Sequence, residues 1–343
     1  MTQTDLTLEV HPGSAPPGWD DALLTVGGVV FHSEAWAAHK TSGGEGDPLF
    51  CLWRQGAGGD VVGRGLGIRR PSRHSRLSSI VAKIGFDSPP ATGAFEGDFV
   101  APLSAWARRS PGVIEVGLGS FDVLGSWLVD PAPRPKARCE YVLPPGTEED
   151  LWSGMRQLAR RKVKRAEKNE IECRETRSPE DLLAFAEVYR VTEERLSRAK
   201  DYVPDSGLDG ERFAGSLSQL IEPGAGRLYA AYAGGRLEAG TVFATFGRRA
   251  YMIYSAASDE AREAGAPFLV MFNALRELRR DGFEHLNLGG AAGDAADPGS
   301  PDHGLHLFKT RFGTQVESRT SGSLALRPLR SKLVEGGRRL VRR

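Results

Sequence analysis

Residues 250–290 read AYMIYSAASDEAREAGAPFLVMFNALRELRRDGFEHLNLGG. The apolar pattern of this stretch predicts a strand at 250–256, a helix at 267–280 and a short strand at 285–288. The last turn of the helix is basic and Gly282 follows it, which suits a helix C-terminus. The apolar side chains of the helix share one face: Phe268, Met271, Phe272, Leu275 and Leu278.

Two longer strands, at 227–232 and 237–246, precede this stretch and are joined at Gly234-Gly235. The order hairpin, strand, helix, strand is typical of the late part of an acetyltransferase fold. Where the strands on either side of such a helix separate, an acyl donor can insert its carbonyl group and accept backbone N–H hydrogen bonds. We therefore expect an α/β (α+β) protein with mixed sheets flanked by helices.

The chain has 343 residues, which predicts two domains. We expect two tandem GNAT-like domains, at 1–143 and 144–326, with the main site in the second and a basic C-terminal helix at 327–343. The proline-rich segment 130–136 is the candidate boundary, although the strand at 139–143 can still pair with the first domain's sheet.

Composition limits the function classes. The formal net charge is +1, so general polyanion binding is not expected and any nucleic-acid contact needs a local basic patch. The three cysteines fit no zinc or CxxC spacing and are expected to be reduced thiols. The first ten residues lack the features of a signal peptide, and no apolar run reaches membrane-spanning length, which favours a cytoplasmic protein. The oligomeric state is not indicated.

The second half begins with a marked helix start, because Thr147 and Asp150 have the spacing of a capping box. The helix at 156–168 that follows is strongly basic. Such a helix is either a solvated face or a surface that contacts phosphates. Its cations are Arg156, Arg160, Arg161, Lys162, Lys164, Arg165 and Lys168.

Four motifs in order resemble the FemABX group of aminoacyl-tRNA-dependent transferases and their acetyltransferase-like relatives. They are FHSEAW at 31–36, the basic run RRKVKRAEK at 160–168, Gly265-Ala266 with NLGG at 287–290, and FKTRFG at 308–313. Asn287 stands where many relatives carry aspartate. No long heptad segment interrupts the second half, so the helical arm of the staphylococcal members is absent.

The resemblance implies an aminoacyltransferase that takes its donor from aminoacyl-tRNA and needs no cofactor. Its acceptor amine belongs to a peptidoglycan precursor or a peptide-like natural product. Lys309, on the FKTRFG segment, is the expected stabiliser of the oxyanion. Tyr251 and Tyr254 lie on opposite faces of one strand, so at most one of them faces the gap between the separating strands. Tyr254 is the second catalytic candidate. The expected substrate-binding residues are Arg198, Tyr202, Phe308, Phe312 and Asn287, and the expected tRNA-binding residues are Arg161, Lys164 and Arg165.

Other interpretations stay open. Residues 262–267 (REAGAP) partly match the loop that binds the pyrophosphate of coenzyme A, which would make the donor an acyl-CoA. A GNAT-like binding module without catalysis is a further possibility. Glu238, Asp294 and Tyr254 are candidates for a general base, and none has a spacing argument. His303 and His306 have no third ligand cluster, so no metal is expected.

Overall fold

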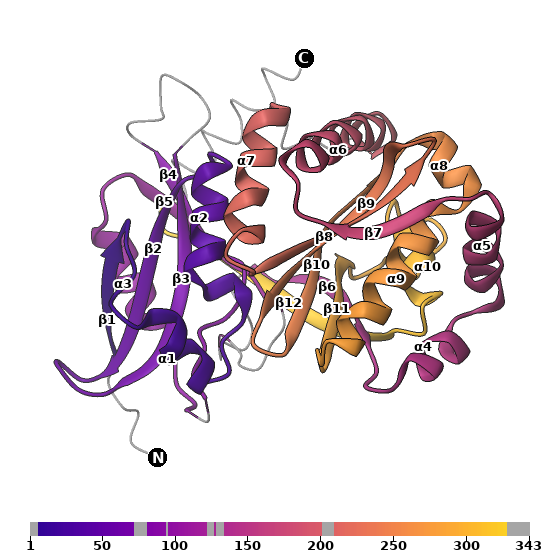
Figure 1. Cartoon of the computed structure of the whole chain (residues 1–343). Coiled ribbons are helices and arrows are strands. Elements are labelled where there is room, and N and C mark those ends of the chain that lie inside the picture. Colours follow the sequence, from indigo (N-terminus) through magenta and orange to yellow (C-terminus); the bar gives the residue numbers. More distant parts are fainter. Residues whose placement is uncertain are drawn as a thin grey trace. The chain divides into compact units, whose positions relative to one another are not determined.

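A computed structural model describes residues 6–71, 81–93, 95–121, 127, 134–200 and 209–327, without the side chains of 198–200 (Figure 1). The chain forms two compact units. Unit 1 comprises Met1–Thr41, Glu45–Ala137 and Arg319–Arg343, and unit 2 comprises Ser42–Gly44 and Arg138–Ser318. Each unit is organised around its own part of the β-structure.

Unit 1 contains a mixed sheet in the order β1-β2-β3-β4-β5-β12, in which only β4 and β5 are parallel neighbours. Its described elements are β1 (Leu6–Pro12), α1 (Trp19–Thr25), η1 (Val30–His32), α2 (Glu34–Ser42), β2 (Asp47–Gln55), β3 (Val61–Pro71), β4 (Ala82–Phe86), α3 (Val100–Arg109), β5 (Val113–Leu118) and β12 (Gln315–Ala325).

Unit 2 repeats this arrangement with the order β7-β8-β9-β10-β11-β6, and here β10 and β11 are the parallel pair. Its described elements are β6 (Lys136–Leu143), α4 (Glu148–Gly154), α5 (Gln157–Lys168), β7 (Glu172–Thr176), α6 (Pro179–Lys200), α7 (Gly210–Ile221), β8 (Gly226–Ala233), β9 (Arg236–Phe246), β10 (Arg249–Ala257), α8 (Asp259–Ala264), α9 (Ala266–Arg280), β11 (His285–Ala292) and α10 (His303–Thr310).

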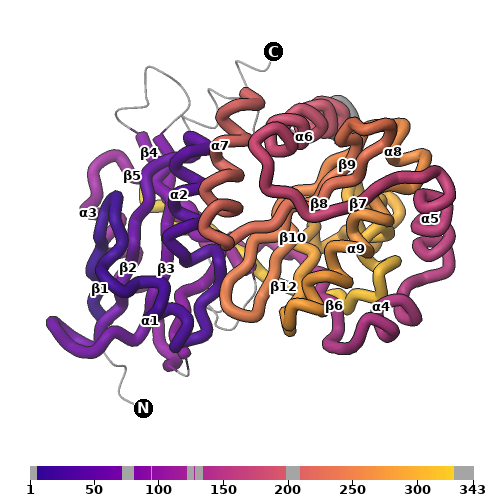
Figure 2. Tube along the Cα trace, viewed as in Figure 1, coloured from indigo at the N-terminus to yellow at the C-terminus, as the bar shows by residue number. Residues whose placement is uncertain are grey.

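The two units exchange their last strand. β6 follows β5 in the chain but pairs with β11, whereas β12 follows β11 but pairs with β5. Figure 2 shows both strands in their sequence colours, β6 in magenta and β12 in yellow. We expected the first domain to extend to residue 143, whereas the second compact unit takes the chain from Arg138 onward. Alternating apolar residues predict a strand but not which sheet edge it joins.

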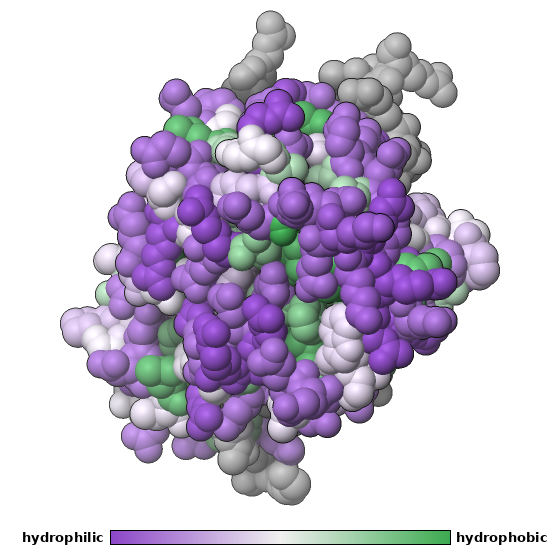
Figure 3. Space-filling view, turned by 45° about the vertical axis from the view of Figure 1, so that its right-hand side comes forward, coloured by the Kyte–Doolittle hydropathy of each residue, from purple (hydrophilic) through white to green (hydrophobic). Residues whose placement is uncertain are grey.

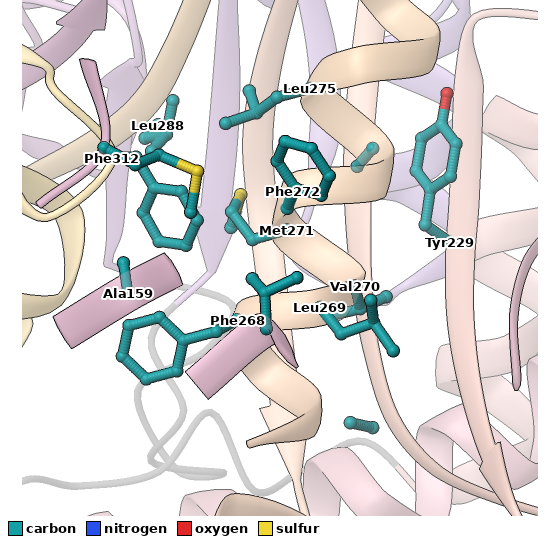
Figure 4. Packing of buried hydrophobic residues seen from close by; sticks show 14 of the residues in the cluster. Ala159, Tyr229, Phe268, Leu269, Val270, Met271, Phe272, Leu275, Leu288 and Phe312 are labelled. Atoms are coloured by element: carbon teal, nitrogen blue, oxygen red, sulfur yellow. The ribbon is translucent and has the colours of Figure 1, made fainter. Parts of the chain in front are cut away.

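Both faces of the sheet of unit 2 are covered by helices. Tyr229 and Ala231 of β8 point into a core that includes α5 and α9, whereas Leu228 and Ala230 point into a core made with α6 and α7. Figure 4 shows the first core, in which α9 side chains pack around Phe312. The apolar face predicted for the helix at 267–280 is confirmed, since Phe268, Met271, Phe272, Leu275 and Leu278 are all buried.

The helix start predicted at Thr147 is confirmed, because Thr147 and Asp150 form a capping box. Side chains cap other helices too: Ser178 accepts the N–H of Asp181 at the start of α6, and the carboxylate of Asp98 accepts the N–H groups of Val100 and Ala101 at the start of α3. The helix predicted at 327–343 lies outside the described residues, apart from residue 327. Among the helices that are described, none is long and apolar enough to cross a membrane.

Candidate active site

The parallel strands of the two units differ in one respect. β4 is paired with β5 from Ala82 to Phe86, the whole length of the strand. β10 is paired with β11 at three positions only, the last being Tyr251 with Asn287. β10 then bulges between Met252 and Tyr254. The separation that the sequence predicts is therefore present in unit 2, next to Gly289-Gly290, where β11 itself bulges against β6.

Lys309 of α10 lies at this point of separation. Its side chain is 2% exposed, and Nζ donates a hydrogen bond to the carbonyl oxygen of Gly290 at 3.0 Å. Nζ also lies 5.2 Å from the centre of the Tyr141 ring. A Cβ atom on Gly289 would lie 3.5 Å from Nζ and 3.0 Å from the Met252 carbonyl oxygen, so a side chain there would crowd the site. Lys309 is therefore a buried lysine and not a solvated surface lysine.

Aromatic packing holds α10 in place. Phe308 and Phe312 make an edge-to-face contact at 5.3 Å, and both rings pack against Phe268 of α9. The two phenylalanines, at i and i+4, therefore form one apolar face of α10 that packs on α9. Phe312 is completely buried, which does not fit the substrate-binding role predicted for it, while Phe308 is partly exposed.

Burial lowers the pKa of Lys309 to about 7. The nearby Arg138 guanidinium acts in the same direction, whereas Cys139, Asp302 and Glu140 favour the charged amine. A lysine with a pKa near neutrality can hold or release a proton at physiological pH.

The sequence did not indicate that Tyr141 belongs to this site. Its hydroxyl lies 2.9 Å from Nδ1 of His306, and the Cys139 thiol donates to the hydroxyl oxygen at 3.4 Å. Burial raises the pKa of Tyr141 and lowers that of His306. Tyr141 was missed because it lies on β6, the strand that we expected near the first domain.

Asn287 is also fully buried, at 0% exposure. Its Nδ2 donates to Oε2 of Glu140 at 2.9 Å, and its Oδ1 accepts the N–H of Gly289 at 2.8 Å. These contacts use both ends of the carboxamide and tie Asn287 to the Gly289-Gly290 bulge beside Lys309, and its burial does not fit the substrate-binding role predicted for it.

Tyr254 is not brought together with Lys309. It packs against Tyr189 of α6 and Phe213 of α7, with ring centroids 5.3 and 5.0 Å away, in the core on the other face of the sheet. The bulge in β10 shifts its register, so the simple alternation used in the prediction does not hold beyond Met252.

The remaining candidates for a general base lie away from Lys309, and the predicted acceptor-site residues fall outside the described part of the chain. Glu238 forms an ion pair with Arg236 at 2.8 Å, and Asp294 accepts a hydrogen bond from Ser300 in an exposed turn. The side chain of Arg198 and all of Tyr202 fall outside the described residues, so their predicted role stays a prediction.

The predicted basic helix is amphipathic. Ala159, Val163 and Ala166 are buried, and none of the ion pairs among the described residues involves its exposed cations. The side of the molecule that carries α5 comes forward in Figure 3 and is mostly hydrophilic. Five of its cations are exposed: Arg156, Arg161, Lys164, Arg165 and Lys168.

The candidate coenzyme A loop at 262–267 is closely packed. The N–H of Gly265 is hydrogen-bonded to the carbonyl oxygen of Ala261 at 3.0 Å, and Pro267 has no N–H to donate. A Cβ atom on Gly265 would lie 2.5 Å from the carbonyl oxygen of Lys162, so α5 closes against this turn. Arg262 is ion-paired with Asp259 at 3.3 Å.

Across the described residues there is no group of three His, Cys, Asp or Glu side chains that could hold a metal ion. The three cysteines are free thiols, as expected.

Comparisons with known proteins agree with this fold. Residues 153–297 match the family model described as "Acetyltransferase (GNAT) domain". No curated protein matches the chain. The solved structure of FemX is similar with a TM-score of 0.65 and 14% identity, over 94% of this chain and all of that chain.

Two further structures are similar over nearly their whole length. L-PGS from Bacillus licheniformis has a TM-score of 0.56 and 14% identity, over 98% of this chain and 99% of that chain. A tandem GNAT protein from the clavulanic acid biosynthesis pathway has a TM-score of 0.52 and 13% identity, over 93% of this chain and 98% of that chain. At these identities the likeness shows the fold, and it confirms the predicted class of two tandem GNAT-like domains.

The depressed pKa of Lys309 makes stability depend on pH. Between about 7 in the folded chain and about 10.4 in the unfolded chain, the unfolded state binds more protons. The contribution of Lys309 to stability is therefore fully present above its pKa in the unfolded chain and is lost as the pH falls through its pKa in the folded chain. From pH 7 to 10, we expect the free energy of unfolding of the wild type to rise relative to that of Lys309→Met, by up to about 1.4 kcal/mol per pH unit.

Denaturant titrations at several pH values measure this difference. Lys168→Met, on the exposed face of α5, is the matched control and should run parallel to the wild type. Parallel curves for Lys309→Met and the wild type would contradict a buried amine that loses its proton near neutrality.

Proposed function

We propose that this protein is an N-acyltransferase that transfers an aminoacyl group from aminoacyl-tRNA to an amine acceptor. One observation carries the proposal: a buried lysine, Lys309, lies where β10 and β11 separate. The fold shared with FemX, and the resemblance of four sequence motifs to the FemABX group, support an aminoacyl donor.

The proposed reaction needs no covalent intermediate, because the donor ester is already activated. The acceptor nitrogen attacks the ester carbonyl carbon and forms a tetrahedral oxyanion. The carbon–oxygen ester bond then breaks, the ribose hydroxyl of the tRNA leaves with a proton, and the attacking nitrogen loses one. Alignment of the two substrates and stabilisation of the oxyanion are what the protein must provide.

Lys309 suits the second task. A protonated amine has three N–H donors, and one is used on the Gly290 carbonyl oxygen. Because the amine is buried, its interaction with a developing negative charge is weakly screened. An oxyanion also favours the protonated amine, which raises the pKa of Lys309 as the charge forms.

The exposed cations of α5 suit a tRNA donor. They belong to the same unit as Lys309 and form a local basic surface on a chain whose net charge is only +1. A polyanion can bind such a surface without any sequence-specific contact. The acceptor we propose is the amine of a peptidoglycan precursor or of a peptide-like natural product.

Coenzyme A as donor is the second candidate, because the similar tandem GNAT protein is described "without AcCoA". The turn at Gly265 weighs against it. A pyrophosphate needs several N–H groups directed outward, but the N–H of Gly265 is used within the chain and Pro267 has none. A binding module without catalysis is less well supported, since a buried lysine amine is costly to retain without a role.

Lys309→Ala should keep the fold and lower turnover on the order of a hundredfold, because one electrostatic stabiliser of the oxyanion is lost. The measurement is amide formation from aminoacyl-tRNA with a panel of amines. Arg236→Ala, which removes an exposed cation away from both α5 and Lys309, is the control and should turn over normally. A folded Lys309→Ala protein with wild-type turnover would refute the assignment.

Replacing Arg161, Lys164 and Arg165 together by glutamate should weaken tRNA binding, and wild-type affinity should fall steeply between low and physiological salt. Filter binding with a charged tRNA at several salt concentrations tests both. The control reverses Arg236 and Arg248, two exposed arginines elsewhere in the same unit. A flat salt dependence, or equal losses in both variants, would count against α5 as the tRNA surface.

A further inference from the structure

We infer that Glu140 and Asn287 are a pair of positioning residues whose hydrogen bond, with asparagine as donor and carboxylate as acceptor, holds the Gly289-Gly290 bulge of β11 against Lys309. The effect on turnover rests on the proposed function. The effect on the bulge and on Lys309 does not, because it concerns contacts inside unit 2 alone.

The pair is completely inside the protein. Glu140 of β6 and Asn287 of β11 are both 0% exposed, and the bond from Asn287 Nδ2 to Glu140 Oε2 measures 2.9 Å. It spans the antiparallel β11–β6 pairing where the register shifts between Asn287 and Gly290. A bulge is an irregular piece of backbone, and this side-chain bond links its two strands.

The other end of the Asn287 carboxamide holds the Gly289-Gly290 bulge itself. Oδ1 accepts the N–H of Gly289 at 2.8 Å, and Gly289 adopts a left-handed φ of 74° that favours glycine. The next carbonyl oxygen, that of Gly290, is the acceptor for Lys309 Nζ at 3.0 Å. A continuous chain of hydrogen bonds and backbone therefore runs from Glu140 to Lys309.

At neutral pH the carboxamide of Asn287 can make both bonds, whereas the carboxylate of an aspartate cannot. The N–H of Gly289 requires an acceptor on residue 287, and the carboxylate of Glu140 requires a donor. Aspartate at 287 would accept from Gly289 but would place two carboxylates within hydrogen-bonding distance. Such a pair shares one proton, and its pKa is raised. The asparagine thus allows Glu140 to remain ionised beside Lys309.

An ionised Glu140 matches the charges around it. Arg138 Nη2 lies 3.6 Å from Oε1 of Glu140, and a Cβ atom on Gly290 would lie 2.2 Å from that same nitrogen. Arg138 and Lys309 therefore both lie beside the Gly289-Gly290 bulge, and Glu140 is the buried carboxylate of β6 next to it. The other titratable groups near Lys309 are Cys139, Tyr141, Asp302 and His306.

The test compares Asn287→Asp, Glu140→Gln and the double variant with the wild type. In Asn287→Asp the two carboxyl groups share a proton at low pH and repel each other at high pH. Its unfolding midpoint should therefore approach that of the wild type near pH 5 and fall below it as pH rises to 8. The matched control is Asn169→Asp, at an exposed position, which should show no such pH-dependent loss.

The double variant reverses the polarity of the bond. Its new carboxamide at position 140 can donate to the new carboxylate at position 287, which still accepts the N–H of Gly289. It should recover most of the stability that Asn287→Asp loses at pH 8. At pH 8, turnover should fall on the order of 10- to 100-fold in Asn287→Asp, because the Gly289-Gly290 bulge is misplaced. Turnover should recover in the double variant together with stability. No recovery of folded protein in the double variant would overturn the inference, even if Asn287→Asp does not fold at neutral pH.

Lys309 supplies a readout that does not depend on substrate. NMR of lysine labelled with ¹³C at Cε follows its titration, assigned with Lys309→Arg and centred near 7 in the wild type. Glu140→Gln removes a negative charge and should move the midpoint down. An unchanged midpoint in Glu140→Gln, with wild-type stability in Asn287→Asp at pH 8, would refute the pairing. If the titration and stability shifts occur but no aminoacyl-tRNA is consumed, the proposed function fails and the positioning pair stands.

Discussion

The bond between Lys309 and the Gly290 carbonyl oxygen is the interaction on which the site depends. It lies where β10 and β11 cease to pair, and it is buried by β6, β11 and α10. Burial lowers the pKa of the amine to about 7 and strengthens its action on nearby charge. The Phe308–Phe312 contact and the Asn287–Glu140 bond locate the two partners of this interaction.

Exchange of the last strand gives each unit part of its sheet from the other half of the sequence. For the site this matters directly, because β6 supplies Arg138, Cys139, Glu140 and Tyr141 to unit 2. The two pairs of parallel strands also differ in how far they remain paired. β4 and β5 stay paired along β4, whereas β10 and β11 open beside a buried lysine.

Sequence patterns predicted the elements of unit 2 well and the site only in part. The helix at 267–280 follows from local periodicity, which α9 obeys, whereas Lys309 was singled out by the resemblance of the FKTRFG segment to the FemABX group. Tyr141 and Glu140 were missed, because long-range strand pairing leaves no local signal. The bulge after Met252 defeated the alternation used for Tyr254, and the burial of Asn287 depends on a partner 147 residues away.

The central claim is tested most directly by measuring which donor the protein consumes. Purified protein is incubated with amine acceptors and either a pool of aminoacyl-tRNAs or acetyl-CoA, and the loss of each donor is followed for the wild type and Lys309→Ala. We predict amine-dependent consumption of aminoacyl-tRNA that requires Lys309, and no saturable binding of acetyl-CoA in the micromolar range. Consumption of acetyl-CoA by the wild type, with aminoacyl-tRNA untouched, would contradict the account.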